Sequence, residues 1–212
     1  MLYNTLVHIF RPLINLINGR PIIKNKEKIP TGNYILIAPH RTWMDPVLLA
    51  LAVYPQKFSF MAKKELFQNP VANWFLRKLN AFPVDRVHPG PSAISKPVKM
   101  LKQTDLSTII FPSGSRYSSK LKGGAVMIAK MTGAPLVPAV YQGPLSFGAL
   151  FSRKKRKINF GDPIYIDRHE RLTKEMQAEL EQKMQAAFDQ LDQELDPSFH
   201  YEMPKKPADD HF

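Results

Sequence analysis

The chain has 212 residues, enough for one good-sized hydrophobic core and rather short for two domains. Its formal net charge of +12 points to an anionic partner such as nucleic acid, a membrane surface or a phosphorylated metabolite. The absence of cysteine excludes disulfides, a thiolate nucleophile and cysteine-bound metal, and the six histidines lack metal-ligand spacing, so we expect no metal and no bound cofactor.

The first predicted element is an amphipathic helix over residues 1–19. Apolar residues recur at three- and four-residue spacing from Leu2 to Ile17, with a bend expected at Pro12 and an end near Gly19. The chain contains no continuously apolar run of 18 residues and no signal-peptide pattern. We therefore predict no transmembrane span and assign this helix to a membrane interface.

Short apolar runs then alternate with helical patterns over most of the chain. Strands are expected at 34–38, 58–62, 107–111, 136–141, 157–160 and 163–166, and helices at 46–53, 70–79, 96–103, 124–132 and 172–195. This alternation predicts an α/β fold with a largely parallel central sheet flanked by helices, including a long C-terminal helix. We place this domain at residues 20–196 and predict a disordered tail at 197–212 from its proline- and charge-rich composition.

Polar residues follow three of the predicted strands. His40 follows the first strand, Lys63 and Lys64 follow the second, and residues 113–116 follow the third. Ligands of open α/β sheets bind at the carboxyl ends of the strands. We therefore expect these polar residues to meet at one edge of the sheet.

His40 and Asp45 are five positions apart, and Pro46 follows at the start of a predicted helix. Taken alone, Asp45 is typical of a helix N-cap, and His40 of a hydrogen-bonded loop histidine. These structural interpretations leave room for catalysis, because a carboxylate beside a histidine can orient the ring and stabilise its charged form. The pair is a candidate general base.

Two further blocks offer anion-binding groups. Arg86 follows a short apolar run, which would hold its guanidinium in place for bidentate hydrogen bonds to phosphate, although a solvated surface arginine is the ordinary alternative. The next block predicts a turn with exposed backbone N–H groups, which suits an anion but also serves as a plain strand-to-helix connection. This turn consists of Ser113, Gly114, Ser115 and Arg116.

Four blocks in this order resemble those of the glycerolipid acyltransferase family: 40–45, 82–86, 111–116 and 137–140. The resemblance extends from about Ile35 to Val140. It implies that His40 is the general base and Asp45 its partner, and that Arg86 binds the acceptor's phosphate.

The same resemblance implies further substrate-binding groups. The third block belongs to the acceptor site, and Pro138 in the fourth block helps to shape the acyl-binding region. From the residues alone, Lys63 and Lys64 would add positive charge, although one of two adjacent residues at a strand end usually points to solvent. This chain departs from the family pattern at Ser113, where glutamate is common, and at Asn80 or Ala81, where glycine is common.

The resemblance implies acyl transfer to the 2-hydroxyl of 1-acylglycerol 3-phosphate (lysophosphatidic acid), forming phosphatidic acid. The donor would be acyl-CoA or acyl-acyl carrier protein. Peripheral binding to the cytoplasmic face of an anionic membrane would use residues 1–19 and the basic run 153–157.

The sequence leaves two alternatives open. One is a different glycerolipid acyltransferase, with glycerol 3-phosphate or a lysophospholipid as acceptor. The other is a non-catalytic basic module that binds membranes or RNA. Because the chain lacks a basic stripe interleaved with regularly spaced aromatic residues, we expect no nucleic-acid partner.

Overall fold

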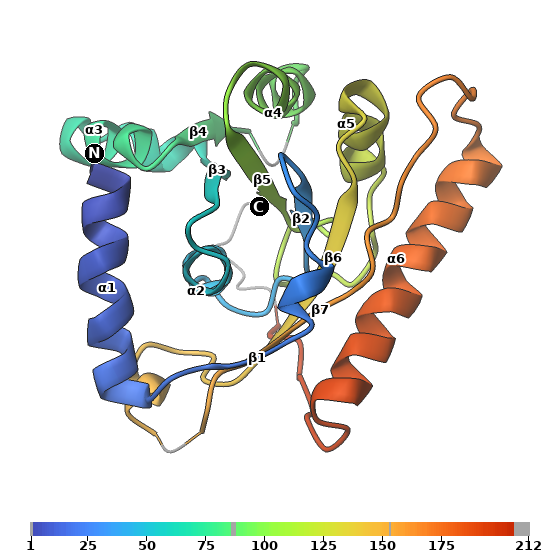
Figure 1. Cartoon of the computed structure of the whole chain (residues 1–212). Coiled ribbons are helices and arrows are strands. Elements are labelled where there is room, and N and C mark those ends of the chain that lie inside the picture. The colour runs from blue at the N-terminus through green and yellow to red at the C-terminus, as the bar shows by residue number, and fades with distance from the viewer. Residues whose placement is uncertain (1, 86–87, 153, 206–212) are drawn as a thin grey trace.

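The computed structural model describes residues 2–85, 88–152 and 154–205 and is built on a seven-stranded sheet (Figure 1). The strands in chain order are β1 (Ile22–Lys24), β2 (Ile35–Ile37), β3 (Lys57–Lys63), β4 (Ala81–Val84), β5 (Leu106–Ile110), β6 (Leu136–Gln142) and β7 (Lys157–Phe160). Their order in the sheet is β1-β7-β6-β2-β5-β3-β4. Every neighbouring pair is parallel except β6 and β7, so the predicted largely parallel α/β sheet is confirmed.

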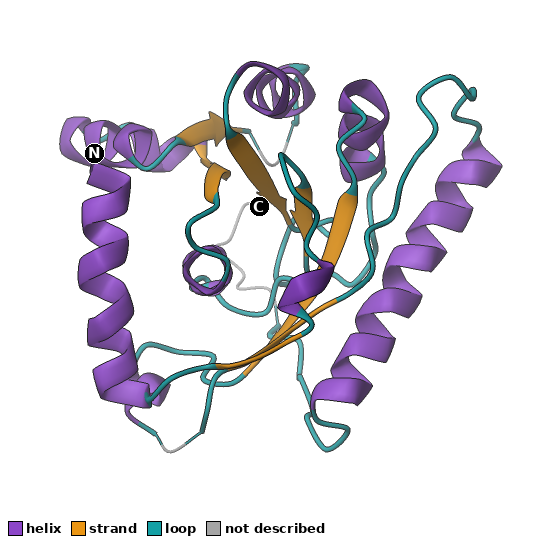
Figure 2. Ribbon diagram, viewed as in Figure 1, coloured by secondary structure: helices purple, strands orange, loops and turns teal. Residues whose placement is uncertain are grey.

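Helices cover both faces of this sheet (Figure 2). They are α1 (Leu2–Asn18), α2 (Asp45–Ala52), α3 (Pro70–Lys78), α4 (Ser92–Gln103), α5 (Gly124–Thr132) and α6 (Lys174–Leu195), with short 3-10 turns η1 (Lys26–Lys28), η2 (Lys64–Phe67) and η3 (Gly148–Phe151). Side chains alternate along each strand, so Leu36 packs on the α1 and α2 side, whereas Ile35 and Ile37 pack on the side of α4, α5 and α6. The central strand β2 is therefore buried from both sides.

The helix at 124–132 and the strand at 157–160 have the predicted bounds. The strand predicted at 163–166 is wrong, because this segment makes only one isolated bridge, between Ile164 and Leu136. Strands β1 and β4 escape prediction, since three and four residues are too short to show a period of two.

The N-terminal helix α1 is fixed to the domain along its length. Tyr3 and Val7 are buried against Leu51 of α2. At the other end, the Asn18 amide donates hydrogen bonds to the carbonyl groups of Leu150, Ser152 and Lys154. In the described part of the chain, no helix is both long and apolar enough to cross a membrane.

The long helix α6 begins with a side-chain cap, in which Thr173 accepts a hydrogen bond from the Met176 N–H. Met184, Phe188, Leu191 and Leu195 bury its inner face against the sheet. Within the tail predicted to be disordered, residues 197–205 contain no helix or strand but place the rings of Phe199 and Tyr201 beside Arg41. Residues 206–212 lie outside the described residues.

Candidate active site

His40 and Asp45 lie close together in the loop between β2 and α2. The His40 Nδ1 and Asp45 Oδ2 atoms are 3.0 Å apart, and the two side chains are 9% and 1% exposed. Because Asp45 accepts a hydrogen bond, Nδ1 carries the proton and Nε2 keeps its lone pair. The ring is thus arranged to accept a proton at Nε2.

Asp45 is not the helix N-cap that its position before Pro46 predicts. Met44 occupies the N-cap position, and Asp45 is the first residue of α2. Its Oδ2 turns back toward the loop and accepts hydrogen bonds from the backbone N–H groups of Arg41 (2.7 Å) and Thr42 (2.9 Å). The carboxylate therefore fixes the loop that carries His40 as well as the imidazole ring.

An aromatic side chain supports the ring from a neighbouring strand. The ring of Phe111, which directly follows β5, stacks on His40 with centroids 4.2 Å apart and planes 20° from parallel. Sequence analysis did not identify this role, although Phe111 is the first residue of the third block. Stacking on Phe111 and the bond to Asp45 together hold the ring in one orientation.

The third block forms the tight turn that the sequence predicts. Gly114 has a φ of +74°, and its N–H donates to the Phe111 carbonyl at 2.8 Å. The Ser113 hydroxyl is buried and donates to the Ser115 carbonyl, while the Ser115 hydroxyl oxygen accepts from the N–H of Tyr117. Both hydroxyl groups therefore stabilise the turn itself.

Lys122 approaches this turn and was missed by the sequence analysis. Its backbone N–H donates a hydrogen bond to the Pro112 carbonyl. Its side-chain Nζ lies 3.4 Å from the position that a Cβ atom would take at Gly114. A larger residue at Gly114 would crowd this ammonium group, besides being strained at a positive φ. No sequence block marks Lys122, because a chain reversal brings it to the site.

The other predicted cations have different surroundings. Lys64 lies at the start of η2, and its Nζ donates to Asp85 at 2.5 Å, which raises the pKa of Lys64. Lys63 ends β3. The Arg116 guanidinium lies 5.7 Å from the ring centre of Tyr117. Arg86 lies outside the described residues.

A cavity of about 340 Å³ adjoins His40. Its polar lining includes Asp85 and Lys122. The apolar lining comes from strands β3 and β5 and helices α4 and α5, and includes Phe60, Met61, Ile94, Ile109, Ile110 and Ile128. The cavity is therefore suited to a hydrocarbon chain whose reactive end lies near His40.

Pro138 does not line this cavity. It lies in β6 opposite Ile37, where it is buried. The structure thus brings His40, the turn at 113–116 and the ends of β3 and β4 to one edge of the sheet, and leaves Pro138 within the sheet. Among the described residues, no three His, Asp or Glu side chains are grouped as metal ligands.

The loop carrying His40 is also tied to the far end of α6. The Arg41 guanidinium pairs with the Asp192 carboxylate and donates to the Tyr141 carbonyl at 2.8 Å. Gln142 donates to the same carboxylate at 2.9 Å, and the Arg41 guanidinium faces the rings of Phe199 and Tyr201. The Arg41 side chain is 8% exposed. Through these contacts it connects the His40 loop to β6, to α6 and to the segment after α6.

Comparison with known proteins places these observations in a family. The family model described as Acyltransferase matches residues 20–142. A 1-acyl-sn-glycerol-3-phosphate acyltransferase of Streptococcus pneumoniae is 45% identical over 196 residues, covering 92% of this chain and 74% of the relative. One of Bacillus subtilis is 41% identical over 184 residues, covering 85% of this chain and 92% of the relative.

A solved structure has the same fold. The 1-acyl-sn-glycerophosphate (LPA) acyltransferase PlsC of Thermotoga maritima superimposes with a TM-score of 0.66 at 20% sequence identity. The match covers 94% of this chain and 81% of that one.

We expect Arg41→Ala to lower the free energy of unfolding by about 2 kcal/mol or more, because it leaves Asp192 without its cationic partner. The loop should also loosen, so the NMR signal of the His40 Nδ1 proton should broaden or disappear. Urea denaturation and proton NMR measure these effects. Arg77→Ala, on the exposed helix α3, is the matched control; equal stability and equal signals in the two variants would contradict the prediction.

Proposed function

This chain belongs to the acyltransferase family, and we propose that it transfers an acyl group from a thioester to the 2-hydroxyl of 1-acylglycerol 3-phosphate, forming phosphatidic acid. The observation that carries the proposal is the buried His40–Asp45 pair beside an apolar cavity. The names of the relatives from Streptococcus pneumoniae and Bacillus subtilis support this acceptor.

His40 acts as the general base in the proposed reaction. Its Nε2 takes the proton of the acceptor hydroxyl as the hydroxyl oxygen attacks the thioester carbonyl carbon. The carbon–sulfur bond then breaks, and the departing sulfur receives the proton. Asp45 holds the Nδ1 proton throughout and stabilises the charged ring. Direct transfer of this kind requires no metal and no covalent acyl-enzyme.

The apolar cavity is the proposed binding site for the acyl chain of the donor. A fatty acyl chain gains free energy by leaving water, and the lining from β3, β5, α4 and α5 offers it an apolar wall. The donor is acyl-CoA or acyl-acyl carrier protein, whose acidic carriers both suit a chain with a net charge of +12.

The acceptor's phosphate is assigned to the basic groups at the same edge of the sheet. Lys122 lines the cavity with His40, and Arg116 is the last residue of the turn of the third block. Arg86 keeps its assignment as a phosphate ligand on sequence grounds alone. Lys64 is already paired with Asp85, so its charge is less available to the acceptor.

The proposed membrane surface combines α1 with the loop around η3. Asn18 joins the end of α1 to carbonyl groups of this loop, and Figure 1 shows the loop beside that end of the helix. The loop carries Lys154 and Lys155. Apolar side chains are exposed on both segments: Ile9, Phe10, Leu13 and Leu16 on α1, and Phe147 and Phe151 beside the loop. Exposed apolar groups beside lysines favour peripheral binding to the anionic cytoplasmic face of a membrane.

We expect His40→Ala to lower turnover by about 10²- to 10⁴-fold, because it removes the proton acceptor. Release of free thiol from an acyl-CoA donor, measured with 1-acylglycerol 3-phosphate as acceptor, gives the rate. His169→Ala removes an exposed histidine and serves as the control. Wild-type turnover in a folded His40→Ala protein would rule out the proposed mechanism.

We expect Ala93→Leu to shift donor preference toward shorter acyl chains, because Ala93 lines the apolar cavity. The value of kcat/KM should fall by about tenfold or more for palmitoyl-CoA and less for lauroyl-CoA. Ser95→Leu adds the same bulk at an exposed position of α4 and should leave the preference unchanged. An unchanged preference in Ala93→Leu would mean that the chain binds elsewhere.

We expect the triple variant Phe10→Ser, Leu13→Ser, Leu16→Ser to bind anionic vesicles about tenfold more weakly or worse, because each exposed apolar side chain loses its gain from burial in the interface. Co-sedimentation with phosphatidylglycerol-containing vesicles measures the effect. The control replaces Met127, Met131 and Tyr165, three exposed apolar residues outside α1, with serine. Equal binding by both variants would place the membrane surface elsewhere.

A further inference from the structure

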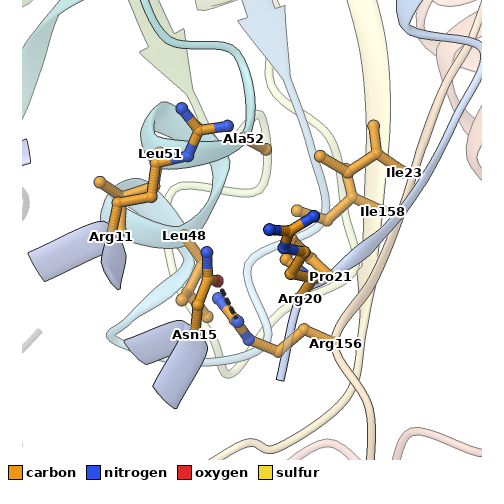
Figure 3. Close-up of a pocket in the computed structure, with 10 residues that line it drawn as sticks. All are labelled: Arg11, Asn15, Arg20, Pro21, Ile23, Leu48, Leu51, Ala52, Arg156 and Ile158. Carbon is orange, nitrogen blue, oxygen red and sulfur yellow. Dashed lines mark hydrogen bonds between the residues drawn. The ribbon is translucent and has the colours of Figure 1, made fainter. Parts of the chain in front are cut away.

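A second cavity of about 350 Å³ lies between α1, α2 and the strands β1 and β7 (Figure 3). Three arginines from separate segments line it: Arg11 on α1, Arg20 between α1 and β1, and Arg156 directly before β7. In Figure 3 their side chains extend around the same space. None of the residues lining this cavity lines the cavity beside His40.

The positive charge at this cavity is not balanced by carboxylates. Within the described residues, none of these guanidinium groups forms a salt bridge. Arg156 is 5% exposed, and burial lowers its pKa. Burial and the neighbouring Arg11 charge lower the pKa of Lys26 in η1. An anion in this space would offset the free-energy cost of burying the Arg156 and Lys26 charges and the repulsion between Arg11 and Lys26.

Helix capping explains only one of the three arginines. Arg156 donates hydrogen bonds to Asn15 (2.9 Å), to Asn18 (3.2 Å) and to the Gly19 carbonyl, so it stabilises the carboxyl end of α1. In the part of the chain that the structure describes, the side chains of Arg11 and Arg20 make no hydrogen bond or salt bridge. Both are exposed, so their guanidinium groups are free to meet a ligand that enters the cavity.

The rest of the lining is apolar. It consists of Pro21, Ile23, Leu48, Leu51, Ala52 and Ile158, with Asn15 as the remaining polar residue. Guanidinium groups form strong bidentate hydrogen bonds with phosphate, and an apolar wall suits the carbon atoms next to it. The lining therefore fits an anionic amphiphile better than a free inorganic ion.

We propose that this cavity binds the phosphoryl headgroup of an anionic phospholipid, with Arg11 and Arg20 as the phosphate ligands and the buried Arg156 adding positive charge to the site. The cavity adjoins α1, the helix that carries the proposed membrane surface, and we therefore assign its anion to a lipid of that membrane. Such a site would add lipid specificity to peripheral binding. It is independent of acyl transfer at His40.

The test uses the full chain and two soluble probes: dihexanoylphosphatidylglycerol below its micelle concentration, and inorganic phosphate at matched ionic strength. Isothermal titration calorimetry gives the dissociation constant of each. The variant Arg11→Gln, Arg20→Gln removes two proposed ligands whose side chains form no hydrogen bond or salt bridge with other described residues. The control Arg168→Gln, Arg171→Gln removes two exposed arginines outside both cavities.

We expect the dissociation constant for the lipid probe to rise about tenfold or more in Arg11→Gln, Arg20→Gln and to stay unchanged in the control. It should also stay unchanged in Arg116→Gln, Lys122→Gln, which removes two proposed phosphate ligands of the acceptor site and so separates that site from this cavity. Inorganic phosphate should bind more weakly than the lipid probe, because it lacks the apolar part.

Two results would overturn the proposal. Equal binding of the lipid probe by Arg11→Gln, Arg20→Gln and by its control would show that the arginines bind no headgroup. Binding of inorganic phosphate as tight as that of the lipid probe would show that the cavity takes free phosphate and not a phospholipid.

Discussion

The arrangement of the site depends on one carboxylate oxygen. Asp45 Oδ2 accepts the His40 ring N–H and the backbone N–H groups of Arg41 and Thr42, all in a setting from which water is almost excluded. Hydrogen bonds to a charged group are the strong ones, and three of them meet at this oxygen, whereas Asp45 Oδ1 is buried and accepts none from the described residues. The loop, the ring and the start of α2 are therefore fixed by a single atom, and the carboxylate lies where the helix dipole favours negative charge.

The order of strands and helices could be predicted because each core strand is a short apolar run and each helix has an apolar period. The carboxyl ends of parallel strands then bring His40 and the third block together, as the sequence analysis expected. Contacts between residues far apart in the sequence leave no such periodic pattern in it. The approach of Lys122 to Gly114, the pairing of Arg41 with Asp192 and the absence of Pro138 from the cavity lining could be known only from the fold.

The departure at Ser113 can be interpreted from the turn. A glutamate at this position would place a carboxylate near Lys122 and Arg116, whereas the shorter serine hydroxyl donates to the Ser115 carbonyl and remains buried. The turn is thus stabilised from within, and Lys122 forms no salt bridge within the described part of the chain. The predicted N-cap role of Asp45 was wrong because its carboxylate bonds to the backbone N–H groups of the preceding loop and not to those of the first turn of α2.

Helix α1 has distinct environments along its circumference. Tyr3 and Val7 are buried against the domain, Ile9, Leu13 and Leu16 are exposed, and Arg11 lines the second cavity. One helix thus combines a packing face, an apolar face of the kind that enters lipid, and a charge placed at a cavity. Because Asn18 and Arg156 fix its carboxyl end to the loop before β7, the proposed membrane surface and the proposed headgroup site keep a defined position relative to the sheet that carries His40. In the proposed reaction, a membrane-bound acceptor would then meet the edge of the sheet that carries His40 in one orientation, and a fixed orientation of the reacting groups favours transfer.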